Sequence, residues 1–347
     1  MIAMHFSKFL SILFFIILLG GCGSNSEKKS NNFSIETNVT DNTLNNSESL
    51  NLSIKNHKNL TIESVEYKLD GKNINDTHDL NTSKLGRHAI EAIILYDDGK
   101  TEKATTSVVI LNSEAPKIYG YKVINEYPHD ITSYTQGLEF YNGELYESTG
   151  QYGKSKLRKI DYKTGEVLKN IDLSQAYFGE GVSVLNDKVF QLTWKSGNGF
   201  VYDLDLEKTG GFKYGQSKEG WGLCNDGNML WKSDGTEKIW TLNPETLIET
   251  DHIQAYTNKG KISNLNELEW VNGKIYANRY QKNGVAIINP KNGAIEGVID
   301  FSPLKNEVTQ HDGLDVLNGI AYNPDTKTIF VTGKHWDKLF EVQIVEK

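Results

Sequence analysis

Residues 138–148 read LEFYNGELYES, two short runs of mixed apolar and polar residues on either side of Asn142-Gly143. Such runs are typical of strands, and Asn-Gly between them favours a two-residue hairpin turn. The same strand–turn–strand pattern returns about every 40–50 residues along the chain. Its later copies are residues 182–193 (VSVLNDKVFQLT), 223–233 (LCNDGNMLWKS), 268–278 (LEWVNGKIYAN) and 320–332 (IAYNPDTKTIFVT). The chain therefore contains an internal repeat over residues 117–347.

A second hairpin is expected after each of these first ones, and three cases are clear. Residues 157–165, 239–245 and 285–293 each hold an apolar run and a turn sequence. Four strands in a repeat of about 40–50 residues are the signature of a propeller blade. The repeat therefore predicts an all-β protein with a five-bladed β-propeller over residues 117–347. The alternative is an irregular sandwich of the same strands, which the regular spacing disfavours.

Residues 34–112 precede the repeat and form a separate unit. Strands are expected at residues 50–54, 62–69, 88–96 and 105–111, with turn sequences at residues 70–71 and 97–99. Strands of this length and spacing predict a small immunoglobulin-like β-sandwich. We find no cluster of reactive side chains in it, so a spacer or adhesion module is expected. The boundary is placed at residues 114–116.

The first residues resemble a secretion signal. Residues 9–19 (FLSILFFIILL) are apolar, but a helix of this length reaches only about 16 Å of the ~30 Å hydrocarbon core. Leu19-Gly20-Gly21-Cys22 resembles a bacterial lipobox. We expect residues 1–22 to be a lipoprotein signal peptide with a lipidated Cys22, and residues 23–33 to be a flexible tether. The alternative is a plain signal peptide with an incidental cysteine.

These features predict a location in the bacterial cell envelope, facing the periplasm or the exterior, with membrane contact through the lipid anchor only. The 347 residues carry 37 Lys and Arg against 45 Asp and Glu, and this acidic balance disfavours nucleic-acid binding. Two cysteines exclude a disulfide scaffold, and Cys224 is expected to be a buried small hydrophobe. A monomer is the default expectation.

The repeat aligns positions that have no structural reason to be chemically similar. Two places before each first strand stand Gln136, Glu180, Trp221, Asn266 and Asn318. The paired strands end near residues 149, 194, 234, 280 and 334. Antiparallel hairpins place these two sets on one face, so they should ring the mouth of the central channel. For Trp194 and Trp221 taken singly, core packing is an equal alternative.

Glu180 is the candidate acid/base group of this ring. It lies between Gly179 and Gly181, where the backbone can approach another chain closely. Apolar walls would raise its carboxyl pKa and suit it to proton transfer near neutrality. The alternative is that the ring residues only close the channel with hydrogen bonds.

Eight motifs in order carry a resemblance to a known family. They are residues 134–138 (YTQGL), 146–150 (YESTG), 178–181 (FGEG), 191–195 (QLTWK), 220–223 (GWGL), 265–270 (LNELEW), 317–322 (LNGIAY) and 331–334 (VTGK). Together they resemble the plant-type and bacterial glutaminyl-peptide cyclotransferases. The resemblance covers residues 117–347 and does not extend to residues 34–112.

The resemblance implies an enzyme that converts N-terminal Gln of peptides or proteins to pyroglutamate with release of ammonia, without metal or other cofactor. It places the essential glutamate at Glu180. It places the substrate-binding residues at Gln136, Phe178, Trp194, Trp221, Asn266 and Lys334, together with Tyr134 where Phe is common and Tyr280 where Trp is usual. An indole N–H, Gln136, Asn266 or Lys334 would then stabilise the oxyanion.

Two other functions remain open at this point. A metal-dependent propeller hydrolase would need several oxygens on one ion, and the ring offers Glu180, Asn266, Asn318 and Asp234. No HExxH or HxxxH spacing occurs among the 8 histidines. A non-enzymatic, cell-surface peptide-binding propeller is the second alternative. Chelator sensitivity tests the former, and turnover of a Gln-initiated peptide tests the latter.

Overall fold

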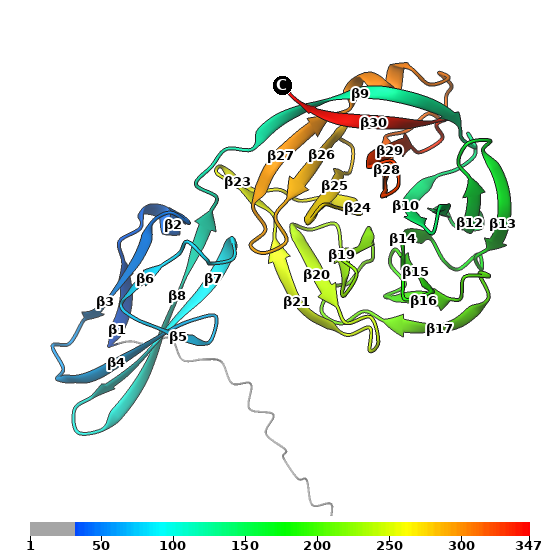
Figure 1. Ribbon diagram of the computed structural model, residues 1–347. Helices are drawn as coiled ribbons and strands as arrows, with labels where there is room; N and C mark the ends of the chain where they lie inside the picture. Colours follow the sequence, from blue (N-terminus) through cyan, green and yellow to red (C-terminus); the bar gives the residue numbers. More distant parts are fainter. Residues whose placement is uncertain (1–31) are drawn as a thin grey trace, which may run out of the picture.

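The computed structural model describes residues 32–347, and the regular secondary structure of this part of the chain is almost all β-strand (Figure 1). Its two helices are short 3-10 turns, η1 at Thr40–Asn42 and η2 at Ser302–Asn306. Within residues 32–347 no helix is both long enough and apolar enough to span a bilayer. Cys22, the expected signal peptide and most of the expected tether lie outside the described residues.

The N-terminal unit contains two sheets. Its strands are β1 (Phe33–Thr37), β2 (Thr43–Asn45), β3 (Ser49–Asn56), β4 (Ile62–Leu69), β5 (Lys72–Ile74), β6 (Thr77–Asp79), β7 (Gly86–Tyr96) and β8 (Lys100–Leu111). One sheet has the order β1-β3-β6 and the other β2-β8-β7-β4-β5. The expected strand at residues 62–69 is confirmed as β4, and the turn at residues 70–71 joins it to β5.

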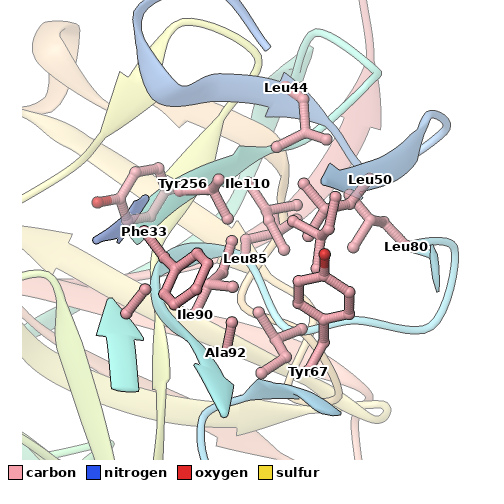
Figure 2. Close-up of a cluster of buried hydrophobic side chains, with 14 of the residues drawn as sticks. Phe33, Leu44, Leu50, Tyr67, Leu80, Leu85, Ile90, Ala92, Ile110 and Tyr256 are labelled. Atoms are coloured by element: carbon pink, nitrogen blue, oxygen red, sulfur yellow. The ribbon is translucent and has the colours of Figure 1, made fainter. Parts of the chain in front are cut away.

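Phe33 belongs to this unit and not to the tether in which we expected it. It is the first residue of β1, only 1% of its surface is exposed, and its ring packs edge-on against Tyr96 at 5.1 Å. Figure 2 shows it among the buried side chains, which include Leu50 and Ile90. A large aromatic side chain in this core makes the folded unit begin earlier than composition suggested.

Residues 117–347 form a ring of sheets that lies beside the N-terminal unit in Figure 1. Three sheets have four strands each, in chain order. The first contains β10 (Thr135–Tyr141), β11 (Glu144–Thr149), β12 (Lys156–Asp161) and β13 (Glu166–Asp172). The second contains β14 (Gly179–Leu185), β15 (Lys188–Thr193), β16 (Asn198–Tyr202) and β17 (Lys208–Lys213). The third contains β18 (Leu223–Asn225), β19 (Leu230–Ser233), β20 (Lys238–Leu242) and β21 (Glu249–Gln254). A two-stranded ribbon, β22 (Tyr256–Thr257) and β23 (Gly260–Lys261), follows.

The remaining strands form one sheet of eight, in the order β24-β25-β26-β27-β9-β30-β29-β28. Their bounds are β9 (Lys117–Pro128), β24 (Leu265–Val271), β25 (Lys274–Arg279), β26 (Gly284–Ile288), β27 (Ile295–Asp300), β28 (Leu317–Asn323), β29 (Thr328–Gly333) and β30 (Lys338–Glu346). β9 pairs antiparallel with β30, which joins the start of the ring to its end. This pairing covers the edge of β30 and closes the ring.

The hairpins predicted from the repeat are confirmed. β10 pairs with β11, β14 with β15, β18 with β19, β24 with β25 and β28 with β29, all antiparallel. Asn142 and Gly143 have φ of 50° and 80°, as a type I′ turn requires, and Asn272 and Gly273 have 49° and 80°. Cys224 is buried and free, as expected.

The first strands of these hairpins lie innermost and pack around the centre in the cyclic order β10, β14, β18, β24, β28. Glycines make this packing possible. A Cβ on Gly181 would lie 2.5 Å from Leu223 N, and one on Gly222 would lie 2.0 Å from Asn266 O. The equivalent position in β24 is Glu267, whose buried carboxylate accepts from Leu138 N at 3.3 Å and Ile320 N at 3.0 Å. Neighbouring backbones therefore meet directly at the centre.

Replacing Gly222 with alanine is expected to lower the free energy of unfolding by about 1–3 kcal/mol, because the new methyl group must push β24 away. Gly210→Ala is the matched control, since its Cβ would come no closer than 3.9 Å, to Val201. Urea denaturation of both variants measures the effect. Equal stability of the two variants would contradict this packing.

The two parts of the chain are joined by specific contacts. Tyr256 and Ala294 of the ring belong to the hydrophobic cluster of the N-terminal unit, where Tyr256 is labelled in Figure 2. Leu85 N donates to Asn292 O at 2.8 Å, and Lys84 Nζ pairs with Asp251 Oδ2 at 2.5 Å. The N-terminal unit therefore packs on the ring near β21.

Candidate active site

A cavity of about 170 Å³ opens at the ends of the inner strands, and all nine substrate and catalytic residues predicted from the sequence line it. They are Tyr134, Gln136, Phe178, Glu180, Trp194, Trp221, Asn266, Tyr280 and Lys334. They come from the starts of first strands and the ends of second strands, as the antiparallel hairpins require. The structure thus brings together residues up to about two hundred positions apart in the chain.

Glu180 lies in β14 with 4% of its surface exposed. Its Oε1 accepts a hydrogen bond from Gln136 Nε2 at 2.8 Å. Its Oε2 is buried and has no partner within residues 32–347. Burial raises the pKa of this carboxyl well above 4.5; the Lys334 charge opposes that rise, and the Glu219 charge adds to it. Glu180 is therefore a carboxyl group that keeps its proton to higher pH than an ordinary glutamate does.

Gln136 is itself oriented by Asn318, which does not line the cavity. Asn318 Nδ2 donates to Thr135 O at 2.9 Å and to Gln136 Oε1 at 3.2 Å. A backbone carbonyl can only accept, so Asn318 must present its nitrogen on this side. Gln136 then presents its oxygen to Asn318 and its nitrogen to Glu180.

Asn318→Ala is expected to reduce catalytic turnover about tenfold, because Gln136 loses the partner that fixes its amide. The hydrogen bond from Gln136 lowers the pKa of Glu180, so its weakening should move the acidic limb of the pH–rate profile to higher pH. Steady-state kinetics across pH measure both. An unchanged rate with an unchanged acidic limb would contradict this role.

Lys334 is the one basic side chain among the nine lining residues, and it is 2% exposed. Its Nζ lies 4.4 Å from the ring centre of Tyr134 and 5.1 Å from that of Tyr280. Burial lowers its pKa to about 8, although the charges of Glu180 and Asp315 oppose the fall. The rings of Tyr134 and Tyr280 thus both lie near the ammonium group, and Tyr280 contributes its phenol ring at the position where Trp is usual.

Aromatic rings form the walls of the cavity. The rings of Tyr134 and Phe178 lie 6.0 Å apart, those of Phe178 and Trp194 5.5 Å apart, and those of Trp221 and Tyr280 5.7 Å apart, all edge to face. These contacts fix the walls against one another. They also keep the surroundings of Glu180 apolar.

The two indole N–H groups that the sequence offered as oxyanion donors have a partner in the structure. Trp194 Nε1 and Trp221 Nε1 both donate to Glu219 Oε2, at 2.8 and 2.9 Å. Both donors are therefore already bound by a carboxylate. The available oxyanion donors are Lys334, Asn266 and the second N–H of the Gln136 amide, whose first N–H is donated to Glu180. Sequence reasoning missed Glu219, although an acidic residue two places before Trp221 was a usable signal.

The oxygens considered for a metal ion are not gathered in the cavity. Asp234 borders a neighbouring groove, where its Oδ2 accepts from Trp240 Nε1 at 2.8 Å. Asn318 does not line the cavity either, so Glu180 and Asn266 are the two of the four that do. Among residues 32–347 no group of three or more His, Cys, Asp or Glu side chains is placed to hold a metal ion.

The fold and site define a ring of β-sheets with a small aromatic pocket around a buried carboxyl group. A sequence profile described as glutamine cyclotransferase matches residues 92–344, and the chain belongs to this family. This confirms the resemblance carried by the eight motifs. The match begins at residue 92, within β7, so the expectation that the resemblance does not extend to residues 34–112 was wrong.

Two relatives support this assignment. The chain is 43% identical over 235 residues to a glutaminyl-peptide cyclotransferase of Arabidopsis thaliana, across 66% of this chain and 72% of the relative. The crystal structure of Myxococcus xanthus glutaminyl cyclase superposes with a TM-score of 0.62 and 33% identity, covering 67% of this chain and 99% of that one.

Proposed function

We propose that this protein is a glutaminyl-peptide cyclotransferase, which converts the N-terminal glutamine of peptides or proteins to pyroglutamate and releases ammonia. The observation that carries this proposal is the free, buried Oε2 of Glu180 in a cavity lined by all nine predicted residues. The cavity is smaller than the about 300–1,000 Å³ of sites for larger ligands, which suits a single amino-acid side chain.

In the reaction the α-amine nitrogen attacks the carbonyl carbon of the glutamine side chain. A carbon–nitrogen bond forms in the ring, and the bond to the amide nitrogen breaks. Because nucleophile and electrophile belong to one residue, holding it in the closed conformation supplies much of the catalysis. The aromatic walls around Glu180 provide that restriction.

Glu180 carries the proton in this mechanism. Its Oε2 takes a proton from the attacking amine, and the same oxygen returns it to the departing nitrogen, which leaves as ammonia. The Lys334 ammonium, with the Asn266 and Gln136 amides, is available to stabilise the oxyanion between the two steps. No step of this mechanism calls on a metal ion.

Ammonia release from a Gln-initiated dipeptide tests the proposal, with an Asn-initiated dipeptide as control and EDTA in a parallel reaction. We expect release from the first peptide only, at the same rate with EDTA. Release that EDTA abolishes would favour the metal-dependent hydrolase. Binding of the peptide without release would favour the peptide-binding propeller.

We also propose the finer architecture. Residues 117–347 are a five-bladed propeller, with the eight-stranded sheet counted as two blades joined where β27 runs parallel to β9. The cyclic packing of the inner strands supports this description. Residues 34–112, with Phe33, are an immunoglobulin-like sandwich, supported by the two sheets that share one core.

Finally, we propose a lipid-anchored monomer of the bacterial cell envelope, attached through Cys22 and binding no nucleic acid. The lipobox-like sequence supports the anchor, and the acidic composition supports the last point. Cys22→Ser is expected to release the protein from the membrane fraction and to remove the lipid from its intact mass. Retention of a lipidated variant would contradict the anchor.

A further inference from the structure

The indole N–H groups of Trp194 and Trp221 in the cavity wall donate to one carboxylate, that of Glu219, which does not line the cavity. Glu219 Oε2 accepts from Trp194 Nε1 at 2.8 Å and from Trp221 Nε1 at 2.9 Å. Glu219 does not line the cavity; it borders the neighbouring groove. Trp194 follows β15 and Trp221 precedes β18, so the two indoles come from different sheets. One carboxylate oxygen therefore ties two walls together.

The backbone that carries Glu219 is anchored on both sides. Lys232, which is buried in β19, donates through Nζ to Glu219 O at 2.7 Å and to Ser217 Oγ at 2.5 Å. Gly220 N donates to Trp194 O at 3.1 Å. The carboxylate is thus held at a fixed place relative to the indoles.

The charge of Glu219 also reaches the catalytic carboxyl. Burial is the main cause of the raised pKa of Glu180, Lys334 opposes it, and the Glu219 carboxylate raises the pKa further. Two negative charges near each other disfavour ionisation of the more buried one. Glu219 therefore acts both on the walls and on the proton affinity of the base.

We propose that Glu219 is a positioning residue, which sets the spacing and tilt of the Trp194 and Trp221 walls around the substrate glutamine. This inference rests on the proposed function, because the substrate defines what the walls must fit. Two consequences separate the wall effect from the charge effect.

Glu219→Ala removes the acceptor and the charge together, and we expect KM for a Gln-initiated dipeptide to rise about tenfold as the indoles lose their shared partner. Glu219→Gln keeps one side-chain oxygen but loses the charge. We expect a KM within about threefold of the wild type and an acidic limb of the pH–rate profile at lower pH.

Glu237→Gln is the matched control. Glu237 borders the same groove, but its carboxylate pairs with Lys261 Nζ at 3.3 Å, and it does not line the cavity. We expect neither KM nor the acidic limb to change in this variant. Far-UV circular dichroism establishes that each variant is folded, and if Glu219→Ala fails to fold, the comparison of Glu219→Gln with the control decides.

Near-UV circular dichroism of the tryptophan bands supplies a readout that needs no activity. Loss of the shared acceptor should weaken these bands in Glu219→Ala and leave them unchanged in Glu237→Gln. If the wild type releases no ammonia, the proposed function fails while this measurement still tests the positioning. The inference would be overturned if both Glu219 variants had the KM, the pH profile and the tryptophan bands of the wild type.

Discussion

Glu180→Gln is expected to reduce turnover of Gln-initiated peptides by about 10²–10⁴-fold, because the amide cannot take the amine proton and return it to the leaving nitrogen. The substituted side chain keeps an oxygen that can accept from Gln136 Nε2, which Glu180 Oε1 accepts at 2.8 Å in the wild type. The walls remain in place, so KM should stay within a few-fold of the wild type. Ammonia release under steady-state conditions measures both constants.

The fold should not suffer from this change. The pKa of Glu180 is raised, so the folded state binds the proton more tightly than the unfolded chain. Ionisation of this group therefore destabilises the folded protein progressively as pH rises above its ordinary pKa of 4.5. The amide removes that penalty, and the melting temperature at neutral pH should equal or exceed that of the wild type.

Glu269→Gln is the matched control for Glu180→Gln. Glu269 is also a buried carboxyl with a raised pKa, but its Oε1 accepts from Tyr322 N at 2.9 Å, and it does not line the cavity. Turnover should be retained in this variant. Near-wild-type turnover by Glu180→Gln would remove Glu180 from the mechanism.

Lys334→Met is expected to lower kcat/KM by about 10²–10³-fold, because the cavity loses the one basic side chain among its nine lining residues. The thioether chain fills similar space but offers no donor to an oxyanion. Burial lowers the pKa of Lys334 to about 8, so the wild type loses the ammonium as pH rises through that value. A basic limb near pH 8 should therefore disappear in the variant.

Lys338→Met provides the comparison for Lys334→Met. Lys338 lies at the start of β30, where its Nζ pairs with Glu126 Oε2 at 2.7 Å, outside the cavity. Kinetics of this variant should match the wild type. Full activity in Lys334→Met, or an unchanged basic limb, would exclude the ammonium from catalysis.

The sequence predicted the cavity well because the repeat constrains it. Once strand–turn–strand units are aligned, antiparallel pairing fixes which ends of the strands meet, and residues as far apart as Gln136 and Lys334 fall on one face. Tyr134 and Phe178 were predicted from the family resemblance alone. The hairpin turns could also be predicted, because the Asn142-Gly143 pair strongly favours a type I′ turn, which needs positive φ at both residues.

The supporting residues could not be read in this way. Asn318 was part of the aligned ring, but only the structure shows that its Nδ2 donates to Thr135 O and Gln136 Oε1. Glu267 stands where the other inner strands have glycine, and its carboxylate serves two distant backbone N–H groups. These roles depend on side-chain direction across neighbouring sheets, which a one-dimensional pattern does not specify. The burial of Phe33 was missed for the same reason.

The most direct measurement for the central claim is the identity of the product formed from a Gln-initiated dipeptide, determined by mass spectrometry and NMR. Cyclisation predicts a pyroglutamyl dipeptide that has lost one ammonia and gained no water, with no free α-amine. A glutamyl dipeptide that keeps its amine would show hydrolysis of the side-chain amide, and an unaltered substrate would show no turnover. Either result would contradict the proposed cyclotransferase.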